Sequence, residues 1–135
     1  MKASRLKLTV MLKQYTCAIF VSDHRQRPEQ IASGVFLQHK GQYYLLSAGH
    51  SVKEWAIEEK KELFINDARH IIKLNGPMVV TQDDDIDIAV IQINHLVNDL
   101  SGIKFVTQEL TSCGRTFSGS PLYFLHGHPV SKNKR

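Results

Sequence analysis

The stretch IASGVFLQHKGQYYLLSAGH, residues 31–50, contains two runs of strand-forming residues separated by a short polar turn. The first run, residues 31–38, has a glycine in its middle, and the second, residues 42–48, is rich in aromatic and aliphatic residues. Because HKGQ between them carries typical turn residues, the stretch predicts a β-hairpin. His50 follows the second strand. A single histidine at a strand end is most often a half-exposed surface residue, so a role for it needs support from elsewhere in the chain.

Most of the remaining chain is also predicted to form β-strands. Short runs of β-branched, aromatic and other apolar residues recur at close spacing, with turn signals between them. These further predicted strands are residues 17–21, 62–66, 70–74, 77–82 and 87–93. Apart from the N-terminal segment, only KEWAIEEKKE, residues 53–62, predicts a helix. Short strands joined by tight turns are typical of antiparallel barrels and sandwiches rather than of βαβ folds, so we expect a mainly β architecture.

The size and composition of the chain fit one folded domain. It has 135 residues, of which 42% are hydrophobic and 22% charged, so extensive disorder is not expected. Lysine and arginine exceed aspartate and glutamate by 17 to 13, which gives a formal net charge of +4. Much of this excess lies near the two ends of the chain. Because no aromatic stacking platform accompanies the basic C-terminal residues, we predict no nucleic-acid partner.

The N-terminal region predicts neither secretion nor membrane insertion. Its apolar stretch, residues 8–12, is shorter than the ~7–15 apolar residues of a signal peptide. The two cysteines, Cys17 and Cys113, fit neither a metal-binding spacing nor a disulfide framework. We therefore expect a cytoplasmic protein without a membrane partner. Over residues 1–16 the apolar spacing fits a strand and a helix equally, and a helix capped by Ser4 is slightly favoured.

A carboxylate further along the chain gives His50 a candidate partner. Asp87 opens the run DIAVIQI, whose remaining residues are almost all apolar. A carboxylate at the mouth of a buried strand can accept a hydrogen bond from an imidazole, orient it and stabilise its protonated form. The structural alternative is a surface imidazole at position 50 and an aspartate that continues the acidic turn of residues 83–85.

The ordered segments SGVFL, YYLLSAGHSV and DIDIAVIQI together resemble the first barrel of a trypsin-like (chymotrypsin-fold) serine peptidase of the intracellular bacterial type. The resemblance covers residues 17–93. It runs more loosely to LYFLHGHPVSKNK, which is similar to the turn that opens the second barrel in such relatives, although His128 stands where they have an aromatic residue. The resemblance implies a Ser-His-Asp triad with His50 as the general base and Asp87 as its orienting partner.

Two departures from the family pattern lie near the histidine. Many secreted members have a cysteine directly after the histidine, whereas Ser51 follows here and no cysteine lies between Cys17 and Cys113. The absence of that disulfide agrees with the absence of a signal peptide. Gly49 stands where alanine is commoner in the family, which is a tolerable change at a crowded position.

The nucleophile is the largest departure from the family pattern. TFSGSPL, residues 116–122, resembles the end of the family signature Gly-x-Ser-Gly-Gly-Pro, but Thr116 and Ser120 replace two of its glycines. About thirty residues separate Asp87 from Ser118, which is room for two or three strands of ~5–6 residues, fewer than a second barrel needs. We therefore expect a nucleophilic serine beyond the end of this chain, with Ser118 as the alternative.

These interpretations divide the chain into three parts. We expect an N-terminal segment (1–16), a first antiparallel β-barrel that carries the histidine and aspartate (17–94), and a connection leading to the first strand of an incomplete second barrel (95–135). The implied function is a serine endopeptidase acting on a peptide or protein substrate, nearly inert in this form because the nucleophile and oxyanion hole are missing. The alternative is a non-catalytic barrel that binds a peptide or protein. An uncovered apolar flank of the barrel would favour self-association.

Other candidate sites carry less weight. His126 and His128 would share one face of a strand, but no cysteine or carboxylate accompanies them at metal-ligand spacing. The acidic run of residues 83–85 lacks the alternating ligands and the glycine of a calcium-binding loop. We therefore predict no metal and no cofactor, and the proposed hydrolysis needs neither.

Overall fold

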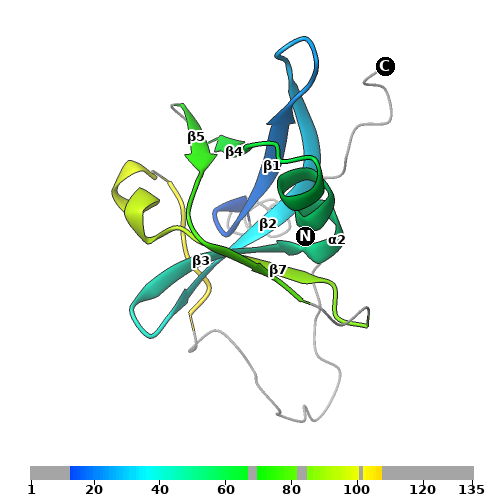
Figure 1. The fold of residues 1–135 in the computed structure, drawn as a ribbon. Helices are drawn as coiled ribbons and strands as arrows, with labels where there is room; N and C mark the ends of the chain where they lie inside the picture. The colour runs from blue at the N-terminus through cyan, green and yellow to red at the C-terminus, as the bar shows by residue number, and fades with distance from the viewer. Residues whose placement is uncertain (1–12, 67–69, 82–84, 101, 108–135) are drawn as a thin grey trace, which may run out of the picture.

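A seven-stranded antiparallel sheet forms the body of the protein (Figure 1). The computed structural model describes residues 13–66, 70–81, 85–100 and 102–107. The strands are β1 (Thr16–Ser22), β2 (Pro28–His39), β3 (Gln42–Ala48), β4 (Leu63–Asn66), β5 (Ile71–Leu74), β6 (Met78–Val80) and β7 (Ile88–Gln92). They lie in the order β5-β4-β1-β2-β3-β7-β6, and the sheet curls into a half-barrel. The predicted mainly β, antiparallel architecture is therefore confirmed.

The hairpin predicted at the outset is formed by β2 and β3. Their register runs from the pair Gly34↔Ser47 to the pair His39↔Gln42. Lys40 and Gly41 connect them, and both have positive φ, 50° and 76°. Two central residues in this conformation give a tight turn whose twist matches that of the flanking strands, which explains why a glycine is suited to the second position.

The two ends of the sheet are held together by a short link. β5 pairs with β4 and β6 pairs with β7, at opposite ends of the strand order, yet only residues 75–77 separate β5 from β6. Gly76 lies in this link, where an added Cβ would come within 2.1 Å of the Gln92 carbonyl oxygen. Because the link is short, the chain draws the two end strands towards each other and curls the sheet around one core.

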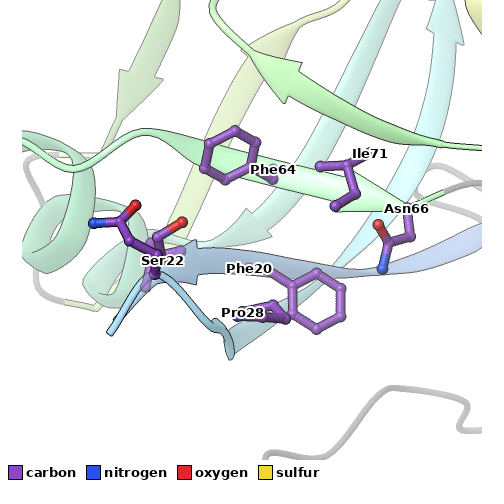
Figure 2. Close-up of a pocket in the computed structure, with 8 residues that line it drawn as sticks. Phe20, Ser22, Pro28, Phe64, Asn66 and Ile71 are labelled. Carbon is purple, nitrogen blue, oxygen red and sulfur yellow. The ribbon is translucent and has the colours of Figure 1, made fainter. Parts of the chain in front are cut away.

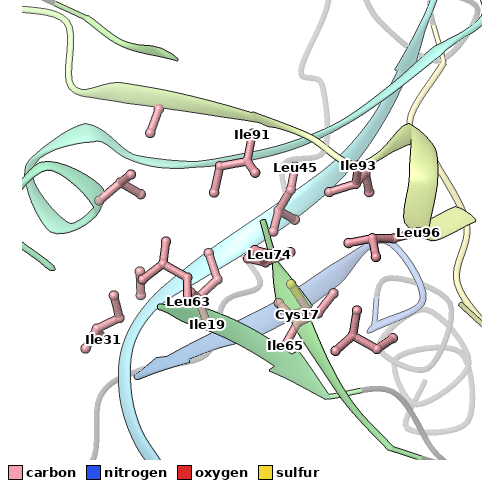
Figure 3. Close-up of a cluster of buried hydrophobic side chains, with 14 of the residues drawn as sticks. Cys17, Ile19, Ile31, Leu45, Leu63, Ile65, Leu74, Ile91, Ile93 and Leu96 are labelled. Carbon is pink, nitrogen blue, oxygen red and sulfur yellow. The ribbon is translucent and has the colours of Figure 1, made fainter. Parts of the chain in front are cut away.

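Alternating residues of the strands fill the concave side of the sheet with apolar side chains (Figure 3). The largest fully buried side chains are Phe36, Ile19, Leu45, Leu63, Ile65, Ile91, Ile93, Val21 and Val52. A β-bulge interrupts the alternation, since Ile19 pairs with Ala32 whereas Phe20 pairs with Gln30. The extra residue, Ile31, is buried together with Ala32. Such a bulge adds local twist and bends the strand, which aids the curl.

The helical segments differ from the prediction. The expected helix over 53–62 begins earlier, as α2 (Gly49–Val52), continues as the π-helix η1 (Lys53–Glu58) and ends sooner. Val52, which is fully buried, anchors the early start, and Lys60 with φ of 55° ends the helical path. A 3₁₀-helix, η2 (Asn94–Asp99), was not predicted and buries Leu96.

The start of β2 also differs from the prediction. β2 begins at Pro28, three residues before the strand predicted over residues 31–38. The predictions for the N-terminal helix up to residue 12, and for the whole of residues 108–135 including Ser118, lie outside the described residues.

Candidate functional site

The sheet register brings His50 and Asp87 together. Ala48, the last residue of β3, pairs with Ile88, the first residue of β7. The chain just after β3 therefore lies beside the chain just before β7, and the Gly49 amide donates a hydrogen bond to the Asp87 carbonyl oxygen at 3.1 Å. In this way the strand pairing places position 50 next to position 87, although 37 residues separate them.

Both oxygens of the Asp87 carboxylate contact His50. Oδ2 lies 2.5 Å from Nδ1 of the imidazole, and Oδ1 accepts a hydrogen bond from the His50 backbone amide at 2.6 Å. Since an ionised carboxylate only accepts hydrogen bonds, Nδ1 is the donor in the first contact and carries the proton. The second contact satisfies an amide in the first turn of α2, which has no other side-chain cap. The carboxylate is thus fixed from two sides by one residue.

The site lies at the rim of the half-barrel, open to solvent. The exposed fractions are 72% for the His50 side chain and 49% for the Asp87 side chain. The hydrogen bond from the imidazole, followed by the bond from the His50 amide, holds the pKa of the Asp87 carboxyl below its ordinary value of 3.8. Asp87 is therefore ionised at neutral pH and ready to stabilise a positive charge on the imidazole.

Gly49 permits the close approach of the two segments. A Cβ added at this position would lie 3.0 Å from Oδ1 of Asp87 and 3.0 Å from the Ile88 amide nitrogen. These are tighter distances than most Cβ atoms show, so a side chain at position 49 would require its neighbours to shift by a few tenths of an ångström.

The arrangement leaves the second imidazole nitrogen available for chemistry. In a neutral imidazole whose Nδ1–H is bound to Asp87, Nε2 carries no proton and can accept one. Across the described ranges, Nε2 of His50 makes no hydrogen bond to another residue. Ser118 lies outside the described residues, so the structure says nothing about whether it approaches Nε2.

Sequence reasoning missed two features of the structure. It did not foresee that α2 starts at Gly49, so that His50 lies in a helical turn rather than a loop. It also missed a pocket on the outer face of β1 and β4, where Phe20 and Phe64 each lie between two buried residues of their strand.

The described residues were also compared with the requirements of a metal site and of a membrane-spanning helix. Within it, no group of three or more histidine, cysteine, aspartate or glutamate side chains is arranged to hold a metal ion. None of its helices has the length and apolar character needed to cross a membrane.

Comparison with known proteins does not add to this geometry. No protein-family model and no curated protein sequence matches the chain.

Proposed function

We propose that His50 and Asp87 are the general base and the orienting carboxylate of a serine endopeptidase of the trypsin-like class. The observation that carries the proposal is the 2.5 Å contact between Nδ1 of His50 and Oδ2 of Asp87, at the rim of an antiparallel half-barrel. This contact, with Nε2 exposed, is the geometry that a base needs to activate a hydroxyl. The half-barrel is compatible with the first barrel of that class.

The proposed chemistry runs through Nε2 of His50. This nitrogen takes the proton of a serine hydroxyl as its oxygen attacks the substrate carbonyl carbon, and the imidazolium is stabilised by Asp87. The proton then passes from Nε2 to the leaving amine, which leaves an acyl-enzyme that water hydrolyses through the same base. The serine is either Ser118 or a residue outside this chain.

Hydrolysis of a chromogenic peptide ester tests the proposal. If Ser118 supplies the nucleophile, the wild type turns the ester over. Asp87→Asn should then lower kcat by about 10⁴-fold, and His50→Ala and Ser118→Ala by about 10⁶-fold. His39→Ala and Asp99→Asn are matched controls, because both residues are exposed and lie in other elements. Turnover that survives His50→Ala unchanged would remove the general base from the mechanism.

A second measurement covers the case in which the nucleophile lies outside the chain and no turnover is seen. Nitrogen-15 NMR of the imidazole at neutral pH should show the proton on Nδ1 in the wild type, and Asp87→Asn should reduce that preference. If Asp87→Asn left the tautomer of the His50 imidazole unchanged, the orienting role of Asp87 would be contradicted.

A second candidate function, a non-catalytic binding module, is favoured by an apolar row on the outer face of the sheet. The row crosses four strands in register, since Val79 pairs with Val90, Val90 with Leu46, and Leu46 with Val35. The exposed fractions of Val79 and Val35 are 70% and 38%, and no member of the row is charged. The proposed partner is a second copy of the chain, since equal uncharged rows can pack face to face without opposing like charges.

Sedimentation of the protein tests the second candidate. The wild type should self-associate with rising concentration, and Val79→Asp should abolish this, because association would bury the new carboxylate. Ile71→Asp is the matched control, since Ile71 is similarly exposed at 64% but lies at the other end of the sheet. A wild type that stays monomeric at high concentration would refute self-association.

A further inference from the structure

A pocket of about 150 Å³ lies at the other end of the sheet from the His50–Asp87 pair (Figure 2). Its main apolar walls are Phe20 of β1, Phe64 of β4, Pro28 of β2 and Ile71 of β5. Phe20 and Phe64 are directly paired across neighbouring strands, and both alternate with buried residues, so their rings lie on the outer face.

The size and lining of the pocket define the chemistry of its occupant. An apolar cavity of about 150 Å³ is large enough for one benzene ring. None of the residues that line the pocket carries a charge, so a charged group placed there would lose hydration without gaining an ionic partner. Two phenylalanine walls also offer edge-to-face contacts to a third ring. A neutral aromatic ring is therefore the best match.

Polar groups flank the aromatic walls and suit a peptide backbone. Because β1 and β4 are antiparallel, Ser22 and Asn66 lie at opposite ends of the phenylalanine pair, as Figure 2 shows. Gln26 contributes a second carboxamide to the lining. Carboxamides both donate and accept hydrogen bonds, as do the amides on either side of a peptide side chain.

The turn that carries Gln26 is held in place by its own hydrogen bonds. Asp23 accepts bonds from the backbone amides of Arg25 at 2.8 Å and Arg27 at 2.9 Å, and from Nε of Arg27 at 3.2 Å. Gln26 itself has a φ of 62°, a conformation that few residues other than glycine adopt. Strained positions of this kind concentrate at binding sites, where the surrounding structure fixes them in advance.

The end strand of the sheet, β5, adjoins the pocket. Ile71 lines the pocket and is also the first residue of β5, the end strand of the sheet. No other strand of the described residues pairs with the second edge of β5. An unpaired edge can add an extended peptide through main-chain hydrogen bonds, while a neighbouring pocket selects one side chain.

We propose that the β5 edge and the adjacent pocket bind an extended peptide, with a phenylalanine side chain of that peptide in the pocket. The edge supplies main-chain hydrogen bonds, the paired rings of Phe20 and Phe64 receive the phenyl ring, and the carboxamides of Gln26 and Asn66 flank the backbone. The site does not depend on the roles proposed for His50 and Asp87.

Binding of a capped Thr-Thr-Phe-Thr-Thr pentapeptide to the full chain, followed by amide NMR, tests the proposal. We expect saturable shifts in the signals of the pocket residues. Replacing the peptide phenylalanine with alanine should weaken binding at least ~10-fold, as should N-methylation of the peptide amides that pair with the edge. Equal binding of the phenylalanine and alanine peptides, or of the methylated peptide, or no binding at about 1 mM peptide, would each overturn the proposal.

Variants of the protein test whether the peptide binds at this pocket. Ile71→Asp should weaken binding at least ~10-fold, and since Ile71 is 64% exposed the fold should persist, as an unchanged NMR spectrum elsewhere would show. His39→Ala and Asp99→Asn should leave binding unchanged, because both residues are exposed and neither lines the pocket. An affinity indifferent to Ile71→Asp would refute this placement whether or not the protein is a peptidase.

Discussion

Two titratable side chains on the same curled sheet, Cys17 inside it and Asp87 at its rim, are shifted in opposite directions. Burial raises the pKa of the Cys17 thiol to about 12, because the core would have to hold an unsolvated thiolate. Hydrogen bonds from His50 instead lower the pKa of the Asp87 carboxyl. The interior thus suppresses charge, whereas the rim stabilises it.

The difference follows from what each position can contact. Cys17 points into the apolar core and has an exposed fraction of 6%, whereas Asp87 lies between two strands where backbone and imidazole donors face it. Chemistry that needs a charged partner is therefore expected only at the rim. The interior serves to fix the register of β3 and β7, which sets the distance between His50 and Asp87.

The reactivity of Cys17 tests whether its thiol is buried in the core, and it has the largest expected effect of these predictions. In a Cys113→Ser variant, where Cys17 is the single thiol, alkylation of the native protein should be about 1000-fold slower than in denaturant, since a pKa three units above the ordinary 9.0 lowers the thiolate fraction by that factor. Iodoacetamide labelling followed by mass spectrometry measures the two rates. Equal rates in native and denatured protein would show that Cys17 is not buried.

Truncation of a core phenylalanine should lower the stability of the protein much more than truncation of a side chain on the outer face. Phe36→Ala should lower the free energy of unfolding by about 3–5 kcal/mol, because Phe36 is only 1% exposed and packs edge-on against Phe105 at 5.7 Å. Val79→Ala on the outer face should change it by less than ~0.5 kcal/mol. Urea unfolding measures both variants, and comparable losses would contradict the assignment of inner and outer faces.

A glycine in the middle of β2 gives a smaller test of how tightly the interior is packed. Removing a glycine from a strand usually stabilises it by ~0.5–1 kcal/mol. At Gly34, however, a Cβ would lie 2.7 Å from Cδ1 of Leu45 and 3.3 Å from Sγ of Cys17. We therefore expect Gly34→Ala to destabilise the protein by about 1–3 kcal/mol in urea unfolding. A stabilised variant would mean that the core has room at this point.

The sequence could predict features that local patterns specify, but not features that depend on contacts between distant segments. The limits of β3 were predicted without error, because Gln42–Ala48 is an apolar run bounded by clear turn residues. The bulge at Ile31, the early start of α2 and the link at Gly76 were not predicted, since each depends on contacts with segments distant in the sequence. Local patterns specify strands, whereas these irregularities are set by tertiary packing.

The candidate site shows the same limit. The positions of His50 and Asp87 at strand ends, together with the family resemblance, indicated them as partners, and the structure brings the two side chains together. Their catalytic roles stay predictions. The pocket beside β5 was missed because it needs the pairing of Phe20 with Phe64, which no single strand reveals.

The smallest expected effect is the pH dependence of the stability that the His50–Asp87 pair contributes. The pKa of Asp87 lies below its ordinary value of 3.8 in the folded protein, so its hydrogen bonds contribute stability above about pH 3.8, and that contribution is lost as the pH falls through the lowered folded value. Because both side chains are largely exposed, the contribution is expected to be small. Comparing urea unfolding of the wild type with that of Asp87→Asn should show a stability difference that shrinks as the pH falls through this acidic range. Carbon-13 NMR of the Asp87 carboxyl should give a midpoint below 3.8, and a midpoint at or above that value would mean that His50 does not hold the carboxylate.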